Sequence, residues 1–157
     1  MDFYLWLEES ALSTWVREAP TVWAYATVLM LHTLGMAVLV GASAVLSLRM
    51  LGVGRTIPLA PLRVLFPVVW VGFSINLATG ALLFGADASS RGVQGLFFVK
   101  LLFVTAGVVS VVLIKRDVYG SSTEQIAVSN RVRGLAMLSL VAWVVAMTAG
   151  RLLAYVR

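Results

Sequence analysis

Six of the polar side chains inside the long apolar stretches are candidates for binding a ligand. They are spread over four stretches: His32, Asn76, Thr79, Lys100, Arg151 and Tyr155. An ionisable side chain within a membrane span is costly, so it normally faces the bundle interior or a wet cavity. Asn76 and Thr79 are close enough in sequence to share a helix face, as are Arg151 and Tyr155. The sequence therefore predicts one cofactor-binding or ligand-binding site, built by four helices in the same half of the membrane.

The predicted site is cationic. None of the apolar stretches contains an Asp or Glu that could neutralise Lys100 or Arg151, and the nearest acids lie outside them, at Glu8, Glu9, Glu18 and Asp87. A buried positive charge without a counter-ion is unfavourable. Unless one of those acids folds in, we expect a lipid-like or quinone-like anion, with its head group at Lys100 and Arg151 and its tail among the helices.

A b-type haem is the alternative ligand. His32 would supply an axial nitrogen, so it would be a metal ligand only if haem is bound, and Lys100 and Arg151 would pair with the propionates. The chain has a single histidine. The second axial ligand would then be water, His32 of another protomer, or a methionine such as Met30, Met36 or Met147.

The same residues also have structural interpretations. Lys100 and Arg151 lie near span ends, where long side chains can extend to the membrane surface. A neutral His32 hydrogen-bonded to Thr79 or Asn76 of a neighbouring helix would simply join two helices. In that case the polar cluster fixes helix register, and the protein acts as a homo-oligomer or as a subunit of a larger membrane assembly.

Several function classes are disfavoured by residue type. The chain has no cysteine, and neither a Ser–His–acid set nor a multi-histidine metal set can be assembled from it. The apolar stretches lack the carboxylates that acid–base catalysis usually needs. We therefore expect that the protein is not an enzyme. We also expect no nucleic-acid partner.

The elements that must position these residues follow from composition. Of the residues, 61% are hydrophobic and 12% charged, which is too apolar for a small soluble domain. Four continuous stretches are long enough to span a bilayer core of ~30 Å, at about 22–48, 64–86, 96–114 and 134–156. Short connections predict antiparallel neighbours. The expected fold is an all-α integral membrane four-helix antiparallel bundle forming one domain, 1–157.

The segments around these spans carry further signals. Residues 1–20 mix Tyr, Trp and Leu with acids, which predicts an amphipathic helix at the membrane interface, redirected by Pro20. Pro67 is expected to kink the second span. The longest connection, 117–130, is predicted to be a mobile loop.

Sequence motifs are distributed over nearly the whole chain: HTLGMA at 32–37, LRMLG at 48–52, PVVWVGF at 67–73, TG at 79–80, LF at 83–84, FVK at 98–100 and GRLLAY at 150–155. With these motifs the chain resembles a family of small, uncharacterised four-helix bacterial membrane proteins. The resemblance implies the same fold and topology and marks His32, Lys100 and Arg151 as signature positions. It implies no reaction. Ser47 stands where such relatives would carry an acid, so no salt bridge to Arg49 is expected.

Charge placement predicts the orientation. The connections between spans one and two and between spans three and four carry most of the cations: Arg49, Arg55, Arg63, Lys115, Arg116, Arg131 and Arg133. By the positive-inside rule these connections are cytoplasmic. We expect a multi-pass protein of the bacterial inner membrane with both termini outside, in the periplasm. Its expected partners are membrane lipids and other membrane subunits or copies of itself.

Overall fold

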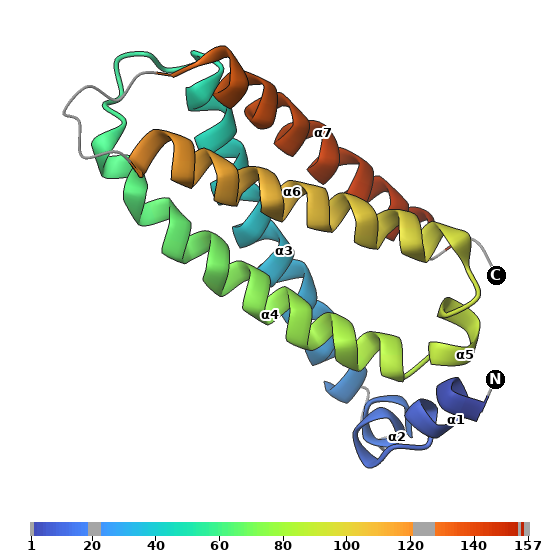
Figure 1. Cartoon of the computed structure of the whole chain (residues 1–157). Coiled ribbons are helices and arrows are strands. Elements are labelled where there is room, and N and C mark those ends of the chain that lie inside the picture. The colour runs from blue at the N-terminus through green and yellow to red at the C-terminus, as the bar shows by residue number, and fades with distance from the viewer. Residues whose placement is uncertain (1, 19–22, 121–127, 154, 156–157) are drawn as a thin grey trace.

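A computed structural model describes residues 2–18, 23–120, 128–153 and 155, and all regular structure in these ranges is helical. Four long helices dominate it (Figure 1): α3 (Trp23–Met50), α4 (Leu65–Gly85), α6 (Gly95–Tyr119) and α7 (Asn130–Leu152). Each is long and apolar enough to cross a membrane. Many apolar side chains point away from the bundle, and Leu102 is 66% exposed. The predicted all-α four-helix bundle is confirmed, and the chain is a multi-pass membrane protein.

Two span boundaries differ from the sequence prediction. Helix α6 continues to Tyr119 rather than ending at 114, because its last turns carry Lys115 and Arg116 beyond the apolar run. Helix α7 begins at Asn130 rather than 134, because the Ser129 hydroxyl accepts a hydrogen bond from Val132 N at 3.3 Å and caps the helix. Because α6 extends to Tyr119, Asp117 belongs to this helix rather than to the connection predicted over 117–130. Residues 121–127 of that loop lie outside the described ranges.

The predicted kink at Pro67 does not fall in the interior of α4. A short 3₁₀ helix, η1 (Ala60–Val64), leads directly into α4, and Pro67 occupies the first turn of α4. The missing backbone N–H costs nothing there, since first-turn N–H groups have no partner within the helix. Before η1 the chain turns at Gly52 and Gly54, whose φ angles of 99° and 62° favour glycine.

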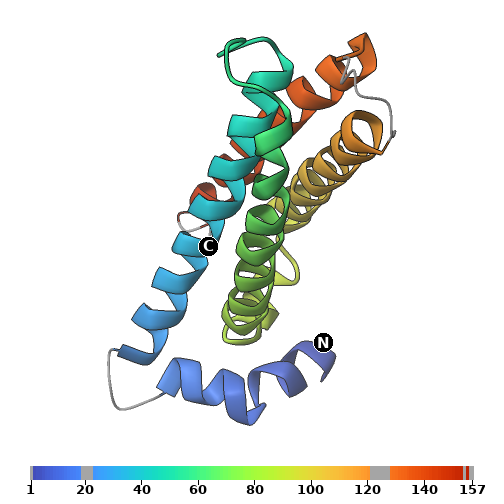
Figure 2. The same cartoon turned by 90° about the vertical axis from the view of Figure 1, so that its left-hand side faces the viewer.

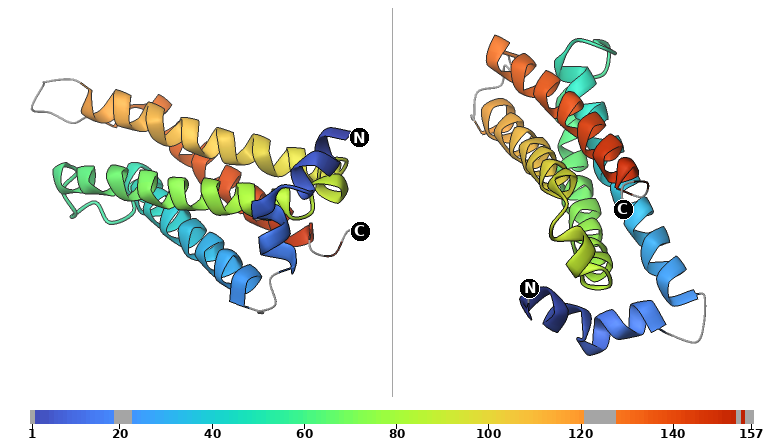
Figure 3. Two further views of the ribbon diagram at one scale, coloured as in Figure 1. Left: turned by 90° about the horizontal axis from the view of Figure 1, so that it is seen from below. Right: turned by 90° about the vertical axis from the view of Figure 1, so that its right-hand side faces the viewer.

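The long helices form three packed seams rather than a closed ring. Helix α3 packs along α4 and also against α7, and α7 packs along α6, whereas α4 and α6 have few direct contacts (Figures 2 and 3). The buried stripe of α7 is made of small residues broken by one Trp, so its neighbours approach closely: Ala136, Ser139, Ala142, Trp143, Ala146 and Ala149. The main hydrophobic core lies in the half of the bundle where α3 ends and α4 begins, and it includes Leu39, Leu46, Phe66, Val69, Val111 and Trp143.

Helices α3 and α4 touch backbone to backbone at two glycines. A Cβ atom built on Gly72 would lie 2.7 Å from Leu39 N, and one built on Gly35 would lie 3.0 Å from Asn76 N. These distances are shorter than real Cβ contacts, so only glycine permits this crossing. The crossing fixes the relative height of the two helices.

The N-terminal segment forms two short helices, α1 (Asp2–Glu8) and α2 (Ala11–Glu18), in place of the single helix predicted over 1–20. They lie across one end of the bundle (Figure 2), here called the α1 end. The Glu8 carboxylate accepts hydrogen bonds from Ser89 N and Ser89 Oγ, both at 2.7 Å, at the start of the short helix α5 (Ala88–Arg91). These bonds hold the pKa of Glu8 below its ordinary value. Pro20 lies outside the described residues.

Replacing Gly72 with alanine is expected to separate α3 from α4 and to destabilise the protein by about 1–3 kcal/mol, the usual range for overpacking. The midpoint of thermal unfolding in one detergent measures this loss. Gly41→Ala is the matched control on α3, because a Cβ there would meet nothing within 4 Å. Equal midpoints for the two variants would contradict the tight crossing.

Candidate functional site

The imidazole of His32 is fixed in a defined orientation by α4. Its Nδ1 lies 3.0 Å from Thr79 Oγ1, and the Thr79 hydroxyl donates its one proton to the Ile75 carbonyl at 2.6 Å. Thr79 can therefore only accept from the ring, which assigns the proton to Nδ1. Nε2 keeps its lone pair and has no hydrogen-bond partner among the described residues. Of the alternatives open from sequence, the bond to Thr79 is the one that the structure contains.

Residues on one face of α4 hold His32 and leave space for its ring. The Asn76 amide donates to the His32 carbonyl at 2.9 Å, which ties the two backbones at the height of the ring. A Cβ built on Gly80 would lie 3.1 Å from His32 Cε1, so the ring occupies the space beside this glycine. Gly72, Asn76, Thr79 and Gly80 follow one face of α4 at helical spacing. One face of α4 thus sets both the helix crossing and the histidine.

His32 lines a cavity of about 430 Å³ at the α1 end of the bundle. The cavity receives residues from α2 and from all four long helices. Its charged lining residues are Arg17, Asp87, Arg91 and Lys100. Its apolar lining includes Leu29, Leu83, Phe84, Phe97 and Leu153. Phe84 and Phe97 stack with ring centroids 4.9 Å apart and so connect α4 to α6, whose backbones seldom approach closely.

Lys100 reaches this cavity across the surface of α7. Its Cδ, Cε and Nζ atoms lie 3.5 to 3.7 Å from the position that a Cβ on Gly150 would occupy. The glycine therefore gives the lysine stem a flat path along the neighbouring helix. The side chain is partly buried and lines the cavity.

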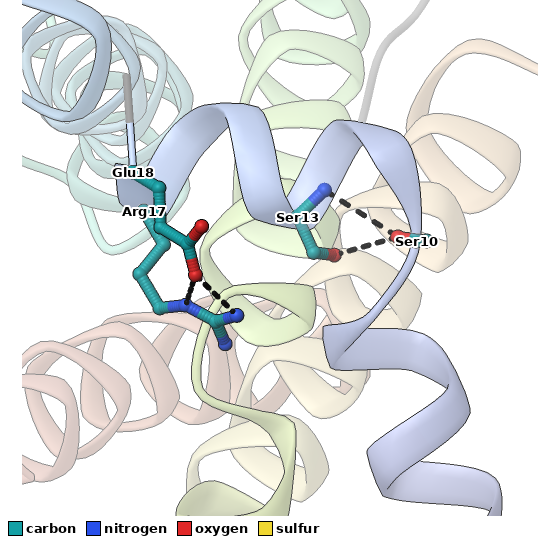
Figure 4. Close-up of polar contacts among 4 residues, drawn as sticks. All are labelled: Ser10, Ser13, Arg17 and Glu18. Atoms are coloured by element: carbon teal, nitrogen blue, oxygen red, sulfur yellow. Dashed lines mark hydrogen bonds and ion pairs between the residues drawn. The ribbon is translucent and has the colours of Figure 1, made fainter. Parts of the chain in front are cut away.

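The cations around the cavity differ in how they are paired. Arg91 Nε donates to Asp87 Oδ2 at 2.9 Å, and its Nη1 donates to the Leu153 carbonyl. Arg17 is paired with Glu18 at 3.0 Å, as Figure 4 shows. Asp87 is one of the four acids considered from the sequence as counter-ions, and it neutralises Arg91. Within the described ranges no carboxylate pairs with Lys100.

The other predicted site residues fall into two groups. Asn76 and Thr79 do not line the cavity, but they hold His32 in place. Arg151 and Tyr155 lie outside it: both are exposed, and the Arg151 guanidinium lies 5.8 Å from the centre of the Tyr155 ring. The four helices thus converge on one cavity, but α7 contributes Gly150 and not Arg151 there.

Arg17 and Arg91 were missed by sequence reasoning because both lie outside the spans, in segments that look like surface. Their short-range partners Glu18 and Asp87, at i+1 and i−4, were the available signal, although such pairs are common on any helix. The described residues contain no group of three or more His, Cys, Asp or Glu that could hold a metal ion. Met30, Met36 and Met147 are not among the cavity's lining residues.

Replacing Thr79 with valine removes the oxygen that accepts the Nδ1 proton. We expect the His32 ring to lose its preference for the Nδ1–H tautomer, which the ¹⁵N imidazole resonances report without ambiguity, because the chain has one histidine. Thr79→Ser keeps the hydroxyl and should keep the wild-type resonances. An unchanged spectrum in the valine variant would argue against the assigned tautomer.

Comparison with known proteins leaves the resemblance stated above as a prediction. No protein-family model, no curated protein and no solved structure matches this chain.

Proposed function

We propose that this membrane protein binds an amphipathic, lipid-like or quinone-like anion in the cavity at the α1 end. The observation that carries the proposal is the Lys100 side chain, which lines the cavity without a carboxylate partner among the described residues. An ammonium group removed from water is stabilised by a counter-ion. A bound anion supplies one.

The ligand's charged group lies between Lys100 and Arg91. Arg91 uses Nε for Asp87 and Nη1 for the Leu153 carbonyl, which leaves its Nη2 donors without a bond in the described ranges. These donors and the lysine ammonium suit a carboxylate, a phosphate or an ionised phenol.

The apolar part of the ligand lies against the hydrophobic lining. Leu29 and Leu83 supply aliphatic surface, and the stacked pair Phe84 and Phe97 supplies a flat aromatic wall. Aromatic pairs of this kind favour a planar or chain-like apolar group. A fully polar anion would leave this surface uncovered.

His32 adds a further requirement. With Nδ1 bonded to Thr79, Nε2 is the ring nitrogen left to accept a hydrogen bond, and His32 is one of the residues that line the cavity. The complementary ligand therefore carries a hydroxyl near its anionic group, as a quinol or a hydroxylated lipid head group does. A ligand without that donor leaves Nε2 unpaired, which weakens binding.

Lys100→Met is expected to remove most of the ligand that co-purifies from the native membrane, because methionine keeps the stem and removes the charge. Native mass spectrometry of protein in mild detergent measures the retained ligand. Arg151→Met is the matched control, since it removes one positive charge from a residue outside the cavity. Equal ligand content in wild type and Lys100→Met would overturn the proposal, as would equal loss in both variants.

A b-type haem is the second candidate, favoured by the orientation of His32. The oriented ring offers Nε2 as one axial ligand, and Lys100 and Arg91 are cations of the kind that pair with propionates. None of the methionines considered lines the cavity, so this chain would hold the iron through one side chain. Bound haem would supply electron-transfer or gas-binding chemistry at its iron.

Haem binding predicts a Soret band in protein purified from its native membrane, shifted on reduction with dithionite. His32→Ala should abolish the band, because it removes the axial nitrogen, whereas Arg151→Met should retain it. A visible region without bands in the wild type would remove this candidate and leave the anion site unaffected.

We also infer an orientation in the bacterial inner membrane with the α1 end outside. The opposite end, where α3 ends and α4 begins, carries Arg49, Arg55, Arg63, Lys115, Arg116, Arg131 and Arg133. Excess Lys and Arg in short connections supports a cytoplasmic location for that end. Among its cations Arg49 donates to the carbonyls of Ile57 and Arg55 at 2.7 and 3.2 Å, and Arg131 pairs with Asp117.

A further inference from the structure

The opposite end of the bundle contains a second basic groove, between the start of α4 and the end of α6. Its volume is about 600 Å³, and its residues are separate from those of the first cavity. Three cations line it, Arg63, Lys115 and Arg116, and no acidic residue is among the lining residues. In the sequence these cations served only to predict the orientation in the membrane. The proposed function does not involve them.

The floor of the groove is rigid and aromatic. Phe66 and Tyr119 meet edge to face with centroids 5.4 Å apart, and the Tyr119 hydroxyl donates to the Leu59 carbonyl at 2.8 Å. Arg63 Nη2 donates to the Tyr119 carbonyl at 3.0 Å, and its guanidinium lies 5.3 Å from the centre of the Tyr119 ring. Lys115 Nζ lies 5.7 Å from the centre of the Phe66 ring. These contacts hold two of the cations over one aromatic surface.

Among the described residues, none of the three cations of the groove has a carboxylate partner. In the ranges that the structure describes, the ion pairs join Arg17 to Glu18, Arg91 to Asp87 and Arg131 to Asp117. Asp117, the nearest acid in sequence to Lys115 and Arg116, is therefore engaged elsewhere. Three positive charges at one site repel each other, and an anion between them relieves that repulsion.

Toward the middle of the membrane the groove continues as a shallow apolar cleft, whose open space of about 10 Å³ offers an apolar surface rather than a tunnel. Phe66, Val112 and Lys115 line both parts, and Val69, Trp70 and Val108 extend the cleft between α4 and α6. Trp70 is 44% exposed, so the cleft borders the surface that faces lipid. A free phosphate would use the cations alone, whereas an acyl chain also covers this apolar surface.

We propose that this groove is a binding site for one anionic phospholipid. The phosphate lies among Arg63, Lys115 and Arg116, and an acyl chain lies over the exposed side of the cleft, against Trp70 and Val112. The cations stand at helix ends, the level at which head groups lie in a bilayer. A phospholipid bound at this site covers the side of the bundle where the backbones of α4 and α6 have few close contacts.

The test uses full-length, delipidated protein in detergent with added phosphatidylglycerol or phosphatidylcholine, and native mass spectrometry reports bound lipid. Phosphatidylglycerol is expected to bind at least about tenfold more tightly than phosphatidylcholine. The double variant Lys115→Gln with Arg116→Gln should lose about tenfold or more in phosphatidylglycerol affinity. Arg55→Gln with Arg133→Gln removes the same charge from exposed residues outside the groove and should stay within about twofold of wild type.

Three outcomes would overturn the site. Equal losses in the two double variants would mean that binding follows net charge rather than the groove. Equal affinity for both lipids would mean that the head-group charge is not recognised. Displacement of phosphatidylglycerol by an equal concentration of inorganic phosphate would make it a phosphate site without an acyl-chain requirement.

A second readout keeps the proposal testable if the groove variant folds poorly. Phosphatidylglycerol with a photoreactive acyl chain should crosslink wild-type protein on α4 and α6, at residues lining the cleft such as Val108 and Val112. Absence of crosslinks at these residues would contradict the acyl-chain path. Lys100→Met should leave the crosslinks at Val108 and Val112 unchanged, so failure of the α1-end site and failure of this site are separate results.

Discussion

The contact on which the site depends is the crossing of α3 and α4 at Gly35 and Gly72. At that point the two backbones approach each other too closely for a Cβ atom to fit between them, and this contact sets the relative height of the helices. One turn further along, that height lets the Asn76 amide reach the His32 carbonyl. Another turn brings Thr79 to the imidazole and leaves the space beside Gly80 for the ring. The orientation of the histidine therefore depends on a helix crossing in which no polar side chain takes part.

The fold was largely predictable because the bilayer imposes strong rules on sequence. Backbone groups in hydrocarbon must be bonded internally, so a continuous apolar run of sufficient length forms a helix. The ends of the helices were less predictable. A helix can continue past the apolar core with charged residues such as Lys115 and Arg116 on its last turns. The effect of Pro67 was hard to predict for a related reason. A proline bends a helix when it stands in the interior but not when it stands in the first turn.

The site was predictable only in part. His32, Thr79, Asn76 and Lys100 were found because polar residues in apolar spans are costly and helical spacing places them on faces. Arg151 and Lys100 carry the same charge at similar depth, and no sequence rule shows that one lines the cavity while the other lies against Tyr155. The difference arises from Gly150, whose bare backbone receives the lysine stem. Arg17 and Arg91 depend on the docking of short helices, which local sequence does not determine.

The weak contact between α4 and α6 makes this bundle a pair of helical hairpins joined along α3 and α7. One hairpin contains α3 and α4, and the other contains α6 and α7, each with its own extensive seam (Figure 1). Both the cavity at the α1 end and the basic groove at the opposite end are lined from each hairpin. The width of each site is therefore set by the spacing between the two hairpins and not by either hairpin alone.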